Sequence, residues 1–145
     1  MSPMNSIYFL VYASTAVKIL NEAELVSLLE PMRAYNQSRK ITGLLLYASG
    51  TFVQVLEGSR SEVLELYGRI LRDVRHKDCT VIAQGERLGR RFPDWTMGFK
   101  NLAELSPAEV PGFSPIFQHT LTLGQITAEP DPVLRLLYSF ANETP

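Results

Sequence analysis

Two helix-start signals divide the first two thirds of this chain into three apolar blocks, and they constrain its fold more than any other feature. Each signal is a capping box, in which a polar N-cap residue is followed three residues later by glutamate, at 21–24 and at 59–62. Apolar residues at helical spacing follow both signals. We therefore expect one helix from Asn21 towards Tyr35 and a second that begins at Ser59. Pro31 lies inside the first helix and lacks a backbone donor, so the sequence predicts a kink or break there.

The blocks between these helices are rich in β-branched and aromatic residues, which predicts strands. The expected strands are 7–13, 41–48, 51–56, 80–83 and 96–99, with a tight turn at Ser49-Gly50. The order β-α-β-β-α-β-β predicts an α+β, ferredoxin-like sheet with both helices on one face and the first and third strands central. Because strands joined through a helix usually pair in parallel, we expect parallel pairing across each helix. Tyr12 and Gln54 then become neighbours in space.

Beyond residue 102 the pattern weakens, so we expect residues 1–102 to form the main domain and 103–145 a C-terminal helical extension. One short helix can begin at Ser106-Pro107 and another at Asp131-Pro132. The second carries an apolar stripe made of Val133, Leu136, Leu137 and Phe140. Such a stripe covers the free face of the sheet or joins a partner chain, and we favour packing on the same chain.

The composition supports one domain with its own core and gives no electrostatic reason for a nucleic-acid or membrane ligand. The chain has 145 residues, 46% of them hydrophobic, with a formal net charge of -1. Its single cysteine, Cys79, cannot form an intramolecular disulfide. No apolar run approaches the roughly 20 residues that span a bilayer. We therefore expect a soluble, cytoplasmic protein.

A glutamine inside an apolar strand is the first sign of a functional site. In the segment FVQVL, Gln54 shares one strand face with Phe52 and Leu56, and a buried amide left without partners costs about 1 to 3 kcal/mol. Polar groups should converge near it from the neighbouring elements. These are Tyr12 at the end of the first strand, Asn36 after the first helix, and Arg69, Asp73 and His76 at i, i+4 and i+7 on the second helix. Amide, phenol and guanidinium groups together suit a planar, polar heterocycle such as a flavin or a nucleobase.

Each of these residues also has a purely structural interpretation. Tyr12 can be a core tyrosine, Asn36 a helix C-cap, Arg69 and Asp73 a surface ion pair, and His76 a partner of the helix dipole. Trp95 and Met97 alternate on one strand face, which core packing explains. His76 and His119 are the two histidines, and neither the metal-binding motifs nor a hydrolytic triad or phosphate-binding loop is present in the sequence. The sequence thus predicts neither a metal site nor an enzyme.

Four linked segments resemble the BLUF domains, a family of blue-light sensors that use flavin. The segments are FLVYAS at 9–14, the Asn36 region followed by ITGLLLY at 41–47, FVQVLEG at 52–58, and RRFPDWTM at 90–97. Their order and spacing fit the family over about residues 5–102. The resemblance implies the ferredoxin-like fold already expected, with an oxidised flavin, usually FAD, held noncovalently between the two helices.

The resemblance also implies a role for each candidate residue. Tyr12 is expected to give an electron and a proton to the excited flavin, and Gln54 to change its hydrogen bonding by rotating or tautomerising. The flavin absorption then shifts to the red without a bond between protein and flavin. The expected cofactor-binding residues are Asn36, Gln54, Arg69, Asp73 and His76, and the expected signal-transmitting pair is Trp95 and Met97.

We expect a photoreceptor that binds FAD, with FMN or riboflavin as alternatives, forms a homo-oligomer and signals to a separate protein partner. Two other hypotheses stay open: a small flavin-dependent oxidoreductase, although the sequence lacks a nicotinamide site, and a cofactor-free interaction module on the same scaffold. Three residues around the expected flavin rim depart from the family pattern and bear on cofactor affinity: Met32, Tyr35 and Lys40.

Overall fold

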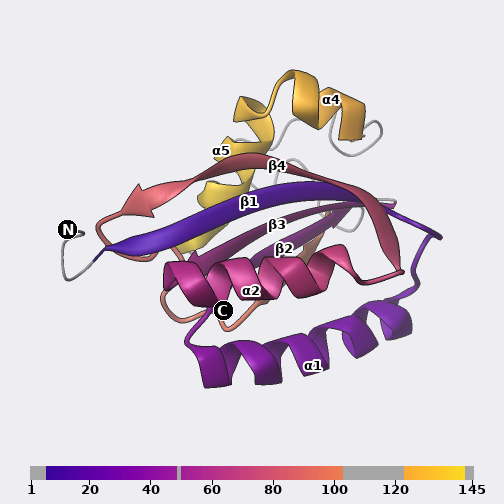
Figure 1. The fold of residues 1–145 in the computed structure, drawn as a ribbon. Helices are drawn as coiled ribbons and strands as arrows, with labels where there is room; N and C mark the ends of the chain where they lie inside the picture. Colours follow the sequence, from indigo (N-terminus) through magenta and orange to yellow (C-terminus); the bar gives the residue numbers. More distant parts are fainter. Residues whose placement is uncertain (1–5, 49, 103–122, 143–145) are drawn as a thin grey trace.

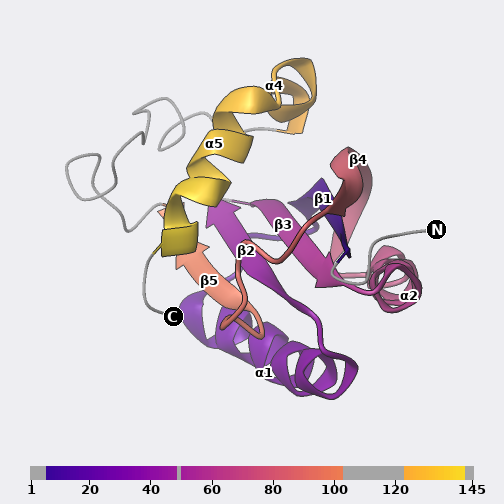
Figure 2. The same ribbon diagram turned by 90° about the vertical axis from the view of Figure 1, so that its left-hand side faces the viewer.

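The computed structural model describes residues 6–48, 50–102 and 123–142, which form one mixed sheet with helices on both faces (Figures 1 and 2). In chain order the elements are β1 (Ile7–Ala16), α1 (Glu22–Arg39), β2 (Thr42–Ala48), β3 (Thr51–Gly58), α2 (Arg60–Leu71), β4 (His76–Arg87), β5 (Gly98–Asn101), α4 (Leu123–Ala128), α5 (Asp131–Ser139) and a 3-10 turn at Phe140–Asn142. Helices α1 and α2 cover one face, and α4 and α5 lie on the other. The α+β, ferredoxin-like fold with a C-terminal helix is confirmed. The short helix expected at Ser106 lies outside the described residues.

The strand order is β4-β1-β3-β2-β5, and the expectation of parallel pairing across the helices is wrong. Strand β1 pairs antiparallel with both β3 and β4, and β2 pairs antiparallel with β3. The reason is the β2–β3 hairpin, which places β3 between β1 and β2, so α1 joins two strands that are parallel but not adjacent. Among the described strands, parallel pairing occurs between β2 and β5.

Helix α1 follows its sequence signals at both ends but continues past Pro31. The capping box forms as expected, since Asn21 Oδ1 accepts from the Glu24 amide at 2.9 Å and Glu24 Oε1 accepts from the Asn21 amide at 3.2 Å. Of the kink or break predicted at Pro31, the break is wrong, because the helix is continuous from Glu22 to Arg39. Proline deprives the carbonyl of Ser27 of its donor, and both residues are exposed, so water can take the donor's place. The helix stops at Lys40, whose φ of 56° is left-handed, a conformation that usually favours glycine.

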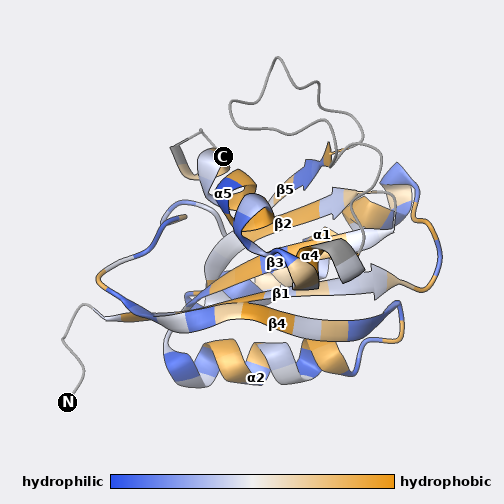
Figure 3. Cartoon of the chain, turned by 90° about the horizontal axis from the view of Figure 1, so that it is seen from above, coloured by the Kyte–Doolittle hydropathy of each residue, from blue (hydrophilic) through white to orange (hydrophobic). Residues whose placement is uncertain are grey.

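Two hydrophobic cores lie on the two faces of the sheet. The core beneath α1 and α2 contains aromatic residues of β1 and β3, including Tyr12 and Phe52. The opposite core joins apolar residues of β1, β2 and β3 to α5 and to the 3-10 turn that follows it. The four stripe residues from Val133 to Phe140 are almost fully buried there. Figure 3 looks onto this face, with α4 and α5 lying across the strands. The apolar stripe therefore packs on its own chain, as the sequence analysis predicted. Within the described part of the chain, no helix is long and apolar enough to cross a membrane.

Candidate functional site

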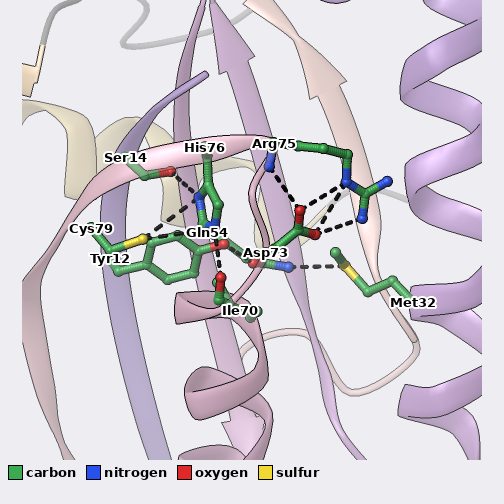
Figure 4. Close-up of polar contacts among 9 residues, drawn as sticks. All are labelled: Tyr12, Ser14, Met32, Gln54, Ile70, Asp73, Arg75, His76 and Cys79. Carbon is green, nitrogen blue, oxygen red and sulfur yellow. Dashed lines mark hydrogen bonds and ion pairs between the residues drawn. The ribbon is translucent and has the colours of Figure 1, made fainter. Parts of the chain in front are cut away.

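The centre of the candidate site is a hydrogen bond between Tyr12 and Gln54. The two residues are register partners on β1 and β3, and both side chains point towards α1 and α2. The Tyr12 hydroxyl donates to Gln54 Oε1 (Figure 4). Tyr12 is 3% exposed and Gln54 0%. A register irregularity between Val11 and Tyr12 on the β4 side of β1 accompanies this placement, as bulges often do where a side chain is redirected.

The amide nitrogen of Gln54 has two sulfur partners. It donates to Met32 Sδ and to Met97 Sδ, both at 3.2 Å. The buried amide that the sequence left unexplained is therefore satisfied on both its oxygen and its nitrogen. Thioether sulfur is only a weak acceptor, so a stronger acceptor placed nearby would compete for these N–H groups.

Tyr12 stays a neutral phenol in this environment. Burial raises the pKa of Tyr12 well above its usual value of 10.0, and electrostatic contributions from Cys79, Tyr67 and Asp73 raise it further. The phenol ring lies 5.4 Å from the ring of Tyr67 and 6.2 Å from that of His76, measured between centroids. A protonated phenol can only be the donor towards the amide oxygen, which fixes the direction of the Tyr12–Gln54 bond.

His76 lies beside Tyr12 but not on a helix. It is the first residue of β4, and its Nε2 lies 2.7 Å from the carbonyl oxygen of Ile70. A carbonyl only accepts, so Nε2 carries a proton, and in the neutral ring Nδ1 accepts from Ser14 Oγ at 2.7 Å. The Cys79 thiol lies 3.6 Å from His76 Nδ1, and burial raises the pKa of this thiol. The sequence analysis missed Ser14, although its position two residues after Tyr12 puts it on the same strand face.

The expected helical stripe of Arg69, Asp73 and His76 is wrong, because α2 ends at Leu71. The Asp73 carboxylate accepts from the backbone amide of Arg75 at 3.0 Å, a local turn that competes with continuing the helix. Asp73 also forms an ion pair with Arg75 at 2.6 Å, which holds the pKa of its carboxyl below the usual value. Arg69 does belong to α2, and its guanidinium lies 4.4 Å from the ring centre of Tyr35.

Asn36 lies inside α1 rather than after it, and Lys40, not Asn36, is the C-cap. Its side chain is fully buried, and its Nδ2 donates to the carbonyl oxygen of Thr96 at 2.8 Å. Its Oδ1 and the hydroxyl of Tyr35 are the buried side-chain atoms without a hydrogen-bond partner within the described ranges. A buried polar atom left unpaired costs about 1 to 3 kcal/mol, so Asn36 offers an acceptor suited to a ligand N–H group.

Trp95 and Met97 lie on opposite faces of the sheet, so their expected alternation on one strand face is wrong. Strand β5 begins only at Gly98, and both residues belong to the segment before it. Met97 packs beneath α1 and α2 against Gln54, whereas Trp95 joins the core under α5, 6.0 Å from the ring centre of Phe92. The segment that carries both residues is the connection between β4 and β5.

Buried contacts fix this connecting segment to β3. The Glu57 carboxylate is 0% exposed and accepts from the backbone amides of Arg91 at 2.7 Å and Phe92 at 2.9 Å. From α1, Arg33 Nε donates to the carbonyl oxygen of Met97 at 2.8 Å. Strand β3 thus contacts the segment twice, through Gln54 on one face and Glu57 on the other.

A pocket opens between α1, α2 and the sheet, directly beside Tyr12. Its lining residues are Tyr12, Leu28, Met32, Leu45, Phe52, Ile70, Asp73, Arg75 and His76. Its volume is about 30 Å³, far below the roughly 300 to 1,000 Å³ of pockets that hold drug-sized ligands. The orphaned Asn36 oxygen and the sulfur-bound Gln54 amide fit the polar edge of a heterocycle. Three fused rings would require lining side chains such as Met32 and the half-exposed Arg75 to turn away.

The chain matches a family model described as sensors of blue light using FAD over residues 7–98. Among curated proteins, it is 36% identical over 89 residues to the photoactivated adenylate cyclase subunit beta of Euglena gracilis, covering 61% of this chain and 10% of that protein. It is 44% identical over 73 residues to subunit alpha from the same organism, covering 50% of this chain and 7% of the relative. The chain thus spans a tenth or less of these cyclases.

Solved structures extend the similarity to the whole fold. A BLUF protein, BlrB, in its dark state aligns with a TM-score of 0.76 and 29% identity, covering 98% of this chain and 100% of that one. A bacterial light-regulated adenylyl cyclase aligns with a TM-score of 0.71 and 34% identity over 89% of this chain and 36% of the cyclase. The photo-activated state of BlsA, at 22% identity, has a TM-score of 0.75 and covers 95% of this chain and 96% of that one. At that identity the likeness concerns the fold alone.

Proposed function

Because this chain belongs to the BLUF family, the sensors of blue light using FAD, we propose that its Tyr12–Gln54 pair is the switch of a blue-light photoreceptor. The observation that carries the proposal is a protonated, buried phenol that donates to the oxygen of a buried amide beside a pocket between two helices. The family binds flavin. We infer that the flavin of this chain is FAD, with FMN and riboflavin as alternatives.

A bound flavin supplies the absorption of blue light and a one-electron acceptor. Tyr12 is then the residue that is oxidised, and its phenolic proton moves along the existing hydrogen bond to Gln54 Oε1. Burial raises the pKa of Tyr12 and for the same reason opposes loss of the phenolic proton to water. Gln54 rotates or takes its imidic tautomer, and the proton and electron return to Tyr12. The altered hydrogen bonds of Gln54 are what distinguishes the lit protein.

The remaining candidates are proposed to hold the cofactor. Asn36 contributes its unpaired Oδ1 as an acceptor for an N–H group on the heterocycle. His76 and Asp73 line the pocket, and Arg75, which pairs with Asp73, lines it too. Arg69 is proposed to act indirectly, by holding the ring of Tyr35, because its guanidinium lies over that ring. In this proposal the Asp73–Arg75 ion pair sits at the mouth and opens when the flavin enters.

The signal is proposed to leave through the segment between β4 and β5. A change in Gln54 acts on Met97, its sulfur partner, and Trp95, two residues earlier in the same segment, lies in the core beneath α5. We propose that residues 1–102 form the light-sensing unit and 103–145 the extension through which a homo-oligomer addresses a separate effector. More than nine tenths of the matched alpha subunit, and nine tenths of the beta subunit, lie outside the alignment, so cyclase activity is not part of this proposal.

A cofactor-free interaction module is the second candidate, and the small pocket volume favours it. The flavin-to-protein ratio of the purified protein, measured after incubation with FAD, separates the two functions. The photoreceptor predicts a ratio near one and a reversible red shift of the flavin absorption under blue light. Protein that stays free of flavin, or a bound flavin whose spectrum ignores light, contradicts the proposed function. Flavin released by denaturation and separated by chromatography identifies FAD, FMN or riboflavin.

A further inference from the structure

The guanidinium of Arg87 lies between α5 and the buried carboxylate of Glu57. Arg87 is the last residue of β4, and its Nη2 donates to the hydroxyl of Tyr138 on α5 at 2.7 Å. The same guanidinium lies 3.8 Å from the ring centre of Phe9 and 5.1 Å from that of Tyr138. Its Nη1 is 4.0 Å from Glu57 Oε2, which is close enough for an ion pair but too long for a hydrogen bond. Arg87 therefore has two oxygen partners within reach and is hydrogen-bonded to one of them.

The hydrogen bonds of Glu57 explain why Arg87 stays with α5. Glu57 Oε2 accepts from the amide of Arg91 at 2.7 Å, and Oε1 accepts from the amide of Phe92 at 2.9 Å. Thr42 Oγ1 also donates to Oε1, at 3.2 Å. A carboxylate that is 0% exposed needs such donors, because a buried charge without partners is costly. While the segment between β4 and β5 supplies its two amides, the carboxylate is satisfied without a direct hydrogen bond from Arg87.

Arg87 is the cation best placed to replace those amides. Among the described residues, it is the one whose side chain forms an ion pair with Glu57. The guanidinium of Arg90 already donates to the carbonyl oxygen of Glu57 at 3.0 Å and to Thr42 Oγ1 at 2.9 Å. A guanidinium also bonds a carboxylate more strongly than it bonds a neutral hydroxyl. If the segment withdraws its amides, Arg87 therefore gains more from Glu57 than from the hydroxyl on α5.

We propose that Arg87 is a positioning residue that exchanges partners between α5 and Glu57. While the segment amides bond the carboxylate, Arg87 holds the Tyr138 hydroxyl and ties α5 to the end of β4. When the segment moves away, Arg87 pairs with Glu57 and Tyr138 is released. This partner exchange is a property of the folded chain, and only its operation by light rests on the proposed function.

Amide hydrogen exchange of α5 in the flavin-free protein tests the bond to α5. Tyr138→Phe deletes the hydroxyl that accepts from Arg87 and keeps the ring, so the α5 amides should exchange about tenfold faster. Arg87→Met should act at least as strongly, and adding Tyr138→Phe to it should change little, because both changes remove the same bond.

Arg91→Met is the matched control for this bond. The Arg91 guanidinium also lies over the ring of Tyr138, at 5.9 Å, but Arg87 is the residue that bonds its hydroxyl. Arg91→Met should therefore change α5 exchange by about twofold, the effect of an exposed cation–π contact. Exchange of α5 that is unchanged in Tyr138→Phe, or raised equally by Arg91→Met, overturns the proposal.

The transfer to Glu57 is tested by removing one amide of the segment. Arg91→Pro deletes the N–H that bonds Glu57 Oε2, the oxygen nearest Arg87, whereas Arg91→Met keeps that N–H. We expect α5 of Arg91→Pro to exchange as fast as α5 of Tyr138→Phe, and the two changes together to add nothing.

Proline can also disturb the packing of Phe92 on the Tyr138 ring, whose centres are 6.1 Å apart. That disturbance does not involve the hydroxyl, so its effect would add to the effect of Tyr138→Phe. Additive effects, or α5 exchange in Arg91→Pro at the wild-type rate, overturn the transfer. If Arg91→Pro does not fold, the response of wild type and Tyr138→Phe to light decides.

Blue light should drive the partner exchange in the FAD-loaded protein. We expect α5 of wild type to exchange about tenfold faster in the light, and α5 of Tyr138→Phe, already released in the dark, to show no further change. Both proteins should keep the red shift, because Tyr138 packs on the face of the sheet opposite Tyr12. A red shift without a change in α5 exchange overturns the operation by light. Absence of the red shift contradicts the proposed function and leaves the results in the dark to decide the partner exchange.

Discussion

Strand β1 carries two tyrosine–glutamine pairs, and they differ in the burial of the glutamine and in what surrounds the hydrogen bond. Tyr12 donates to Gln54 on β3, and Tyr8, four residues earlier on the same face, donates to Gln84 Oε1 on β4 at 2.7 Å. Gln54 is fully buried beside the pocket, whereas Gln84 is exposed at the edge of the sheet. Tyr8 lies under the guanidinium of Arg60. The comparison teaches that a phenol–amide bond becomes a candidate switch only where the amide is buried and a pocket lies beside it.

The largest expected difference between the pairs is photochemical. Tyr12→Phe removes the proposed electron and proton donor and should abolish the light-induced red shift of the FAD-loaded protein. Tyr8→Phe, which deletes the same hydroxyl from the other pair, should keep the full shift. Light-minus-dark absorption spectra measure both. A red shift that survives in Tyr12→Phe, or one lost in Tyr8→Phe, breaks the distinction between the pairs.

The second difference concerns stability. Gln54→Leu leaves the buried hydroxyl of Tyr12 without its acceptor and should lower the free energy of unfolding by about 1 to 3 kcal/mol. Gln84 is exposed, so Gln84→Leu should alter the free energy of unfolding by less than about 0.5 kcal/mol. Urea unfolding of flavin-free protein gives both values. Equal losses from the two variants would mean that burial does not distinguish the pairs.

The third difference is a dependence on pH that belongs to Tyr12. An unfolded tyrosine ionises near pH 10, whereas the buried Tyr12 stays protonated to higher pH because its pKa is raised. Its contribution to stability is therefore complete below about pH 10 and is lost as pH rises towards the folded pKa, at about 1.4 kcal/mol per pH unit. Urea unfolding above pH 10 should show this slope in wild type and in Tyr8→Phe. Tyr12→Phe should lose this part of the slope and keep the part that comes from Tyr67, whose pKa is also raised by burial. An unchanged slope in Tyr12→Phe would assign the whole effect to other groups.

The smallest expected effect comes from the surroundings of Tyr12. Ser14→Ala removes the hydroxyl that pairs with His76 Nδ1 and should cost about 1 kcal/mol of unfolding free energy. His76 keeps its bond to the carbonyl of Ile70, so the ring should stay in place. The same denaturation assay measures the loss, with Thr15→Ala, the next residue on the opposite strand face, as control. A change within error for Ser14→Ala would show that this bond does not support the site.

Local patterns in the sequence predicted the elements and the central contact of the site. The capping boxes placed the starts of both helices, and strand alternation with the two central strands brought Tyr12 and Gln54 together. The apolar stripe of α5 and the turn after it was enough to favour packing on the sheet, because four apolar positions at helical spacing need a surface to cover.

The failures have two causes. Strand pairing and the path of the β4–β5 segment depend on contacts distant in sequence, and the end of a helix depends on competing local bonds. Antiparallel pairing of β1 follows from where the hairpin inserts, which no single segment encodes. Asp73 ends α2 by bonding to the backbone of Arg75, so a stripe counted at helical spacing did not exist. Met97 reaches Gln54 because its segment is anchored by Glu57 and Arg33, two residues far away in the chain.

The central claim is that illumination changes the hydrogen bonding of the Gln54 amide and not that of Gln84. The most direct measurement is the light-minus-dark infrared spectrum of FAD-loaded protein with isotope-labelled glutamine side chains. We predict a labelled carbonyl band that shifts on illumination, persists in Gln84→Leu and disappears in Gln54→Leu. A labelled band that does not respond to light, or one that survives in Gln54→Leu, would contradict the account.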